Sequence, residues 1–127
     1  MATRREIEEL LRALYAARID ARIEELCGLF TDDASFRISG SSEGKPIAVS
    51  VRGSNEIRLW LSMMAKSFKI SRYQVLSMII DGTSAAVQWR ADINSRITGT
   101  IAPTELIDLI EVRDARIRTY VEFFVPC

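Results

Sequence analysis

The polar residues that could carry chemistry in this chain stand in segments that alternate like β-strands. In the predicted strand Ser84–Asn94, Arg90 and Asp92 share one face, because successive side chains of a strand point to opposite sides. Residues two apart on a strand lie about 6.6 Å from each other, so one arginine can bridge two carboxylates there. One of the two acids can then stay ionised as a base while the other keeps a proton. On composition alone, such a polar face is more often solvated.

A second candidate acid is Asp108, which interrupts the apolar run Glu105–Val112. Its neighbours on the same strand face are apolar, and such surroundings raise the pKa of a carboxyl group. Asp108 could instead be a structural ion-pair partner of Arg90 or Arg118. Both uses remain open at the level of the sequence.

The chain contains no histidine. This excludes imidazole bases, histidine-based triads and most zinc sites. Any catalysis would therefore use carboxylates, tyrosine, arginine or cysteine. We expect neither a metal nor a cofactor.

Length and charge limit the class of protein further. The 127 residues are expected to form one domain, residues 1–127. The 17 basic and 17 acidic residues cancel and no basic run exceeds Arg4-Arg5, so we expect no nucleic-acid partner. No signal peptide or membrane-spanning stretch is visible. Cys27 and Cys127 are too few for a disulfide framework, which indicates reduced thiols and a cytoplasmic location.

Helical patterns fill the first half of the chain. Thr3 and Glu6 form a capping box before the first helix, Asp20 is placed to cap a second helix that reaches Phe30, and Ser54 caps a third. Each of these segments carries an apolar stripe at helical spacing.

Strands dominate the second half, where the hydrophobic period changes to two. The predicted strands are Ala34–Ile38, Ala48–Arg52, Ser71–Ile80, Ser84–Asn94, Glu105–Val112 and Arg116–Val125. Asp81-Gly82 is a strong hairpin signal, and the Gly- and Ser-rich segment Ser39–Lys45 is predicted to be a loop. Helices followed by long antiparallel strands indicate an α+β fold.

The order of Leu26–Phe36 and Arg52–Ile57 resembles a known superfamily. A helix stops near two carboxylates, a short strand follows, and a Gly-Ser sequence starts a new helix. This arrangement is similar to the nuclear-transport-factor-2-like superfamily, in particular its SnoaL-like and ketosteroid-isomerase-like branch. The resemblance implies a cystatin-like cone, in which a curved antiparallel sheet wraps around N-terminal helices and leaves an apolar pocket. It also implies a homodimer through the sheet.

Limonene epoxide hydrolases, which belong to this superfamily, suggest how polar residues would converge. Arg90 and Asp92 are similar to the Arg-x-Asp of these enzymes, and Glu122 falls where they place a further carboxylate on the final strand. The resemblance implies that all three face the pocket. The tyrosine and asparagine that hold a water in these hydrolases correspond here to Phe36 and Ile38.

Ketosteroid isomerases provide a second comparison. Tyr15 resembles their oxyanion-hole tyrosine, and Asp108 resembles the neutral acid beside it. Ile38 stands where these enzymes carry the aspartate that serves as general base. The same branch also contains cyclases and proteins that only bind, so the reaction stays open.

Strand parity gives an expectation about assembly. If Arg90 and Asp92 face the pocket, an apolar row on the other side of that strand is left bare and needs a two-fold partner. That row is Val87, Trp89, Ala91 and Ile93.

Together these patterns predict a pocket for a small, largely apolar molecule. Its predicted catalytic residues are Tyr15, Arg90, Asp92, Asp108 and Glu122, and its predicted ligand contacts are Phe36, Ile38, Trp60, Met64 and Tyr120. The first hypothesis is a cofactor-independent isomerase, cyclase or hydrolase that uses carboxylates. The alternative is a binding or dimerisation module of the same fold without turnover.

Overall fold

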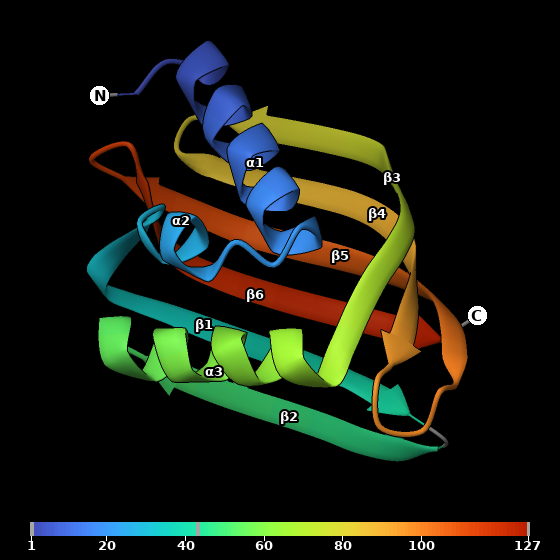
Figure 1. Ribbon diagram of the computed structural model, residues 1–127. Helices are drawn as coiled ribbons and strands as arrows, with labels where there is room; N and C mark the ends of the chain where they lie inside the picture. Colours follow the sequence, from blue (N-terminus) through green and yellow to red (C-terminus); the bar gives the residue numbers. More distant parts are fainter. Residues whose placement is uncertain (1, 43, 127) are drawn as a thin grey trace.

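The structure, a computed structural model, describes residues 2–42 and 44–126. Its elements are α1 (Arg4–Ile19), α2 (Ile23–Cys27), β1 (Phe30–Ser42), β2 (Lys45–Arg52), α3 (Ser54–Ser67), β3 (Phe68–Asp81), β4 (Ser84–Ser95), β5 (Ile101–Arg113) and β6 (Arg116–Pro126). The six strands form one sheet in the order β2-β1-β6-β5-β4-β3 (Figure 1). Within it β1 and β6 run parallel, and all other neighbours are antiparallel.

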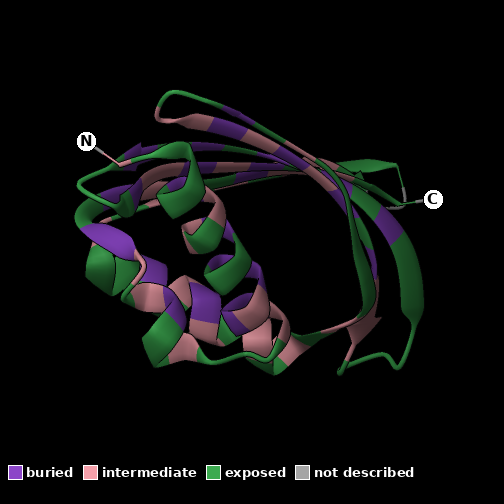
Figure 2. Cartoon of the chain, turned by 90° about the horizontal axis from the view of Figure 1, so that it is seen from above, coloured by how far each residue is buried: buried purple, intermediate pink, exposed green. Residues whose placement is uncertain are grey.

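The sheet curves around the three helices and leaves its outer side bare (Figures 1 and 2). Helix α1 packs against β3, whereas α3 lies along β1 and β2. This arrangement confirms the α+β cone. No helix among the described residues is long and apolar enough to cross a membrane.

Helix α1 forms for the reasons that the sequence indicates, but the predicted role of Asp20 was wrong. Thr3 and Glu6 form the capping box, since each accepts a hydrogen bond from the other's backbone N–H. Asp20, expected to cap a second helix, is instead the C-cap of α1. The second helix is also shorter than expected, because it ends at Cys27 and Phe30 already begins β1.

Strand β1 extends through most of the segment that was predicted as a loop. Gly40 pairs with Phe124 of β6, and a Cβ atom on Gly40 would lie 2.5 Å from the Phe124 carbonyl oxygen. Glycine is therefore required here by the close approach of two strands rather than by a turn. The loop contracts to the connection between Ser42 and Lys45.

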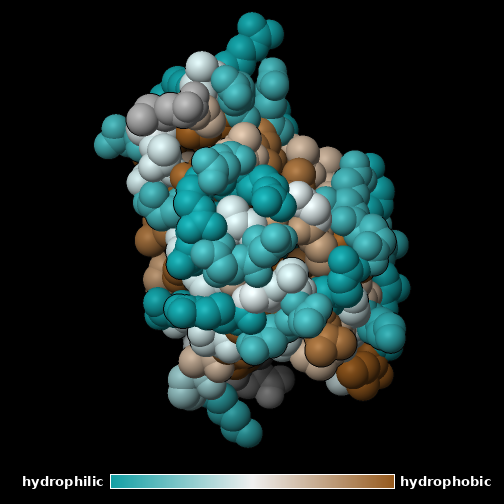
Figure 3. Space-filling view, turned by 90° about the vertical axis from the view of Figure 1, so that its left-hand side faces the viewer, coloured by the Kyte–Doolittle hydropathy of each residue, from teal (hydrophilic) through white to brown (hydrophobic). Residues whose placement is uncertain are grey.

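The end of the molecule that carries the β5–β6 turn is polar. Seen from this side, the surface is mainly hydrophilic (Figure 3). Arg113, at the end of β5, pairs with Asp33, and Arg118 lies 3.6 Å from the same carboxylate. These ion pairs connect β1 to the β5–β6 hairpin at the surface.

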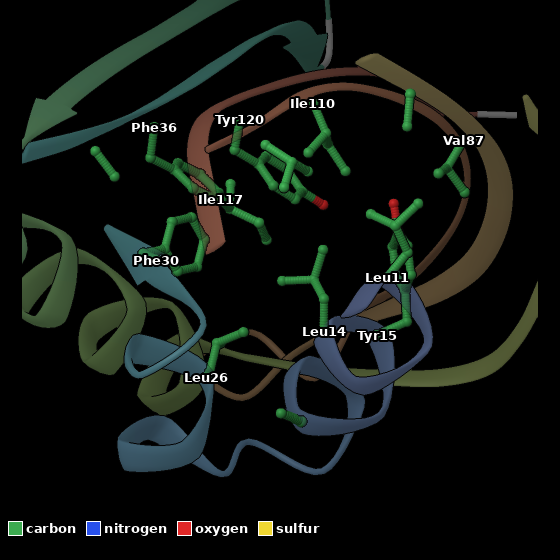
Figure 4. Close-up of a cluster of buried hydrophobic side chains, with 14 of the residues drawn as sticks. Leu11, Leu14, Tyr15, Leu26, Phe30, Phe36, Val87, Ile110, Ile117 and Tyr120 are labelled. Carbon is green, nitrogen blue, oxygen red and sulfur yellow. The ribbon is translucent and has the colours of Figure 1, made fainter. Parts of the chain in front are cut away.

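The core fills the space between the sheet and α1. Leu11, Leu14 and Tyr15 extend from the helix toward Val87, Ile110 and Tyr120 on the strands (Figure 4). The apolar row of β4 lies on this inner side, where Val87, Trp89 and Ala91 are buried. The expectation that this row faces a two-fold partner was therefore wrong.

Candidate functional site

A pocket of about 460 Å³ lies between α3, the end of α1 and the concave face of the sheet. Its wall is largely apolar and includes Ile38, Trp60, Met64, Phe68, Leu106 and Phe124. This volume is in the range of sites that hold small molecules, and such sites usually combine apolar walls with a few polar groups.

Glu122 and Arg18 form a polar site within this apolar wall. Glu122 is 3% exposed and extends inward from β6, while Arg18, 9% exposed, comes from the last turn of α1. Nη1 of Arg18 donates to Oε1 of Glu122. Oε2 accepts no hydrogen bond from the described residues, yet it is not among their fully enclosed polar atoms. A carboxylate oxygen therefore remains reachable from the pocket.

Asp108 lies directly across the β5–β6 ladder from Glu122 and is fully buried. Its Oδ2 accepts hydrogen bonds from the Tyr15 hydroxyl at 2.5 Å, from Trp89 Nε1 at 2.8 Å and from the Tyr120 hydroxyl. Its Oδ1 has no partner among the described residues. The acid is thus held rigidly by three donors on one oxygen.

The two acids belong to one hydrogen-bonded cluster, because Arg18 reaches both sides of it. Nη1 of Arg18 donates to Glu122 and, at 2.8 Å, to the hydroxyl of Tyr120, which in turn donates to Asp108. The guanidinium also lies 5.2 Å from the Trp89 ring centroid, within cation–π range. A continuous chain therefore connects the pocket to the interior of the core.

The surroundings of Asp108 favour its protonated form. Burial, and then the charge of Glu122, raise the pKa of Asp108 to about 7, against the lowering effect of Arg18 and the two tyrosines. Burial also raises the pKa of Tyr15 and of Tyr120, so both phenols stay protonated donors. Burial alone would lower the pKa of Arg18, but Glu122 and its other partners keep it well above its ordinary value. Below neutral pH, Asp108 is thus mainly neutral and adds no second negative charge beside the Arg18–Glu122 ion pair.

The predicted convergence of Arg90, Asp92 and Glu122 was wrong. Arg90 is exposed on the convex face, where its Nη2 donates to Gln74 at 3.1 Å. Asp92 lies on the same side, 3.9 Å from Arg72. The apolar row of β4 is needed in the core, and parity then turns these charges outward.

The other predicted site residues divide into two layers. Ile38, Trp60 and Met64 line the pocket as expected, beside Glu122. Phe36 and Tyr120 stack face to face at 4.8 Å in the core and do not line the pocket. Tyr15 and Asp108 also lie in this deeper layer.

Arg18 belongs to the site but was not among the residues predicted from the sequence. The signal was present, because Leu11, Leu14, Tyr15 and Arg18 follow one another at helical spacing on the buried stripe of α1. An arginine on such a stripe needs a buried acid. Glu122 is that acid.

No group of three or more metal-ligating side chains occurs within residues 2–42 and 44–126. Cys27 is a half-buried free thiol, and Cys127 lies outside the described residues.

The sequence matches the family model of the SnoaL-like domain over residues 11–120. The chain belongs to this family. A search of curated proteins gave no match. The family lies in the NTF2-like superfamily, in agreement with the cone and its pocket.

Solved structures share this fold at low sequence identity. A Bacillus subtilis protein described as a proposed isomerase has a TM-score of 0.83 and 21% identity, covering 98% of this chain and 89% of its own. A hypothetical protein with a ketosteroid-isomerase-like fold from Catenulispora acidiphila, solved in complex with trimethylamine, has a TM-score of 0.75 and 15% identity, covering 90% of this chain and 83% of its own. An LEH-like epoxide hydrolase from M. tuberculosis has a TM-score of 0.73 and 15% identity, covering 94% and 82%. At these identities the similarity concerns the fold alone.

Proposed function

We propose that the pocket binds a small, largely apolar molecule and that Glu122 acts on it as a general base. The observation that carries this proposal is a carboxylate almost completely buried in an apolar wall, with one oxygen fixed by Arg18 and the other reachable. A base in such a place is positioned before the ligand arrives, and little water competes for it.

The reaction classes that fit are isomerisation, cyclisation and hydrolysis. Glu122 Oε2 can take a proton from a carbon next to a carbonyl group or from a water molecule. Asp108 does not line the pocket, so its role is to keep a proton and to hold Tyr120, which positions Arg18. The fold neighbours described as a proposed isomerase and as an epoxide hydrolase support these classes.

The test is the substitution Glu122→Gln. The amide keeps the shape and the acceptor for Arg18 but cannot act as a base. With a panel of small enones and epoxides, we expect the variant to bind the ligands that the wild type converts and to lose about 100-fold or more in kcat. Glu105→Gln is the matched control, because Glu105 is exposed on the neighbouring strand. Equal turnover in Glu122→Gln and wild type would contradict the proposal.

A binding module without turnover is the second candidate, and the surroundings of Glu122 favour it. Ile38 is the cross-strand neighbour of Glu122 and offers no hydrogen bond to a water. The nearby Thr104 hydroxyl already donates to the Ala102 carbonyl at 2.9 Å. Binding of panel compounds by wild type without any turnover would support this candidate.

We also propose that the protein forms a homodimer through the convex face of the sheet. Exposed apolar side chains of β3, β5 and β6 gather there, and we call them the convex patch: Ile79, Ile107, Leu109 and Phe123. A patch of this kind on a bare sheet is typical of an isologous interface. The cytoplasmic location stays a prediction.

A further inference from the structure

Two cations stand at the mouth of the pocket. Lys69, at the start of β3, and Arg96, directly after β4, both belong to its lining. The ladder places Lys69 opposite Asn94, and the Arg96 backbone N–H donates to the Ser67 carbonyl at 2.8 Å. Figure 1 shows the end of α3, the start of β3 and the β4–β5 connection together at this edge.

Within the described part of the chain, no acid neutralises these two cations. Among the described residues, no carboxylate lies within ion-pairing distance of Lys69 or Arg96. Arg96 uses its Nε to donate to the Ala65 carbonyl at 3.2 Å, which directs the guanidinium to the mouth and leaves its other nitrogens free of bonds to the described residues. The hydroxyl-bearing Ser95 and Thr100 line the same place. The mouth therefore offers donors and positive charge.

The inner end of the pocket carries an acid instead of free cations. Glu122 is the only acid in the lining among residues 2–42 and 44–126. Glu122 lies opposite Asp108 of β5. Asp108 is six residues from Ala102, which lines the mouth on the same strand. Six residues of extended strand span about 20 Å, so Glu122 lies far from the mouth. Arg18 is already paired with Glu122 and leaves no net positive charge there. An anionic group therefore finds no net attraction at the inner end, where the free oxygen of Glu122 faces it, and is attracted at the mouth.

We infer that the ligand is an amphipathic carboxylate, with its apolar body in the pocket and its carboxylate between Lys69 and Arg96. The inference rests on the proposed function, since it names the class of molecule that the pocket binds. It also sets the orientation, because the part of the ligand that reaches Glu122 must be the end far from the carboxylate.

Three probes with one apolar chain and different head groups test this inference: octanoate, octan-1-ol and octylammonium. Titration calorimetry near neutral pH and low salt is expected to show that octanoate binds at least about tenfold more tightly than octan-1-ol, with octylammonium weakest. In Lys69→Gln/Arg96→Gln, the affinity for octanoate should fall about tenfold while that for octan-1-ol stays within about twofold. Lys69→Gln alone, which leaves the Arg96 contact with Ala65 intact, should lose about threefold.

The matched control is Lys66→Gln/Arg90→Gln, which removes the same charge from exposed positions outside the lining. It should leave the preference for octanoate unchanged. Octan-1-ol or octylammonium binding as tightly as octanoate to the wild type would overturn the inference while leaving the apolar pocket intact. If none of the three probes binds, the proposed function fails, and the inference fails with it.

Discussion

At the scale of single residues, the site is defined by an unequal number of charges. Asp108 and Glu122 are cross-strand neighbours on β5 and β6. Arg18 supplies one cation for the two acids: it contacts Glu122 directly and Asp108 only through Tyr120. The remaining charge is removed by a proton, because burial raises the pKa of Asp108 to about 7 from 3.8. The folded state therefore favours the protonated form of Asp108.

This proton gives a test through the pH dependence of stability. Between about pH 4 and pH 7 the folded chain binds more protons at Asp108 than the unfolded chain, so its contribution to the free energy of unfolding falls as pH rises. The loss is up to about 4 kcal/mol. In Asp108→Asn this loss is absent, and urea unfolding at about pH 5 and about pH 8 should give a smaller difference than in wild type. Asp92→Asn, on the convex face, is the control. A wild-type profile retained in Asp108→Asn would contradict the assignment.

At the scale of elements, the sequence predicted the fold well and the site only in part. Period and turn signals identified the helices and both long hairpins, because these depend on neighbours in the chain. The predicted orientation of β4 was wrong, because the resemblance to a motif placed Arg90 on the inner face. The alternation of the strand also allowed Trp89 to face inward and Arg90 to face outward, as the structure has them. The partner of Glu122 could not be read from local pattern. Arg18 is more than a hundred residues away in the chain, and only the packing of α1 on the sheet brings them together.

The close approach of β1 and β6 at Gly40 is a second testable feature of an element. Gly40→Ala would place a Cβ atom 2.5 Å from the Phe124 carbonyl oxygen and 2.6 Å from its ring. Since backbone cannot yield easily, we expect a loss of about 1–3 kcal/mol in the free energy of unfolding. Phe124 also lines the pocket, so octanoate binding should weaken as well. Gly28→Ala is the control, because its Cβ would find the nearest atoms at 3.5 Å. Equal stability of the two variants would show that the strands separate at no cost.

At the scale of the whole molecule, the sheet has one filled face and one bare face. The register places Ile79 and Leu109 on either side of Ala86 in one row and Ile107 beside Phe123 in the next, so the three strands of the convex patch are joined through Ala86 of β4. Its side chains are large, with Phe123 43% and Ile79 63% exposed. Contact between two such faces would remove this surface from water.

Light scattering at micromolar concentration is expected to give the mass of a dimer. Ile107→Lys/Phe123→Lys should give a monomer, because like charges would meet at the two-fold interface. Ile97→Lys, at an exposed apolar position outside the sheet, should remain a dimer. A wild-type monomer would leave the convex patch without this role.

The parallel pairing of β1 with β6 has a consequence for how the chain reaches its final form. Phe36 finds its partner Tyr120 only after the intervening helix and four strands have been made, and such distant pairings form slowly. Until then, β1–β2 and β3–β4–β5 can fold only as separate half-sheets, since β6 is the strand between them. Glu122 arrives on that same strand. During synthesis, the sheet is therefore completed at the same step that brings the proposed base into place, and a partly made chain lacks the candidate site.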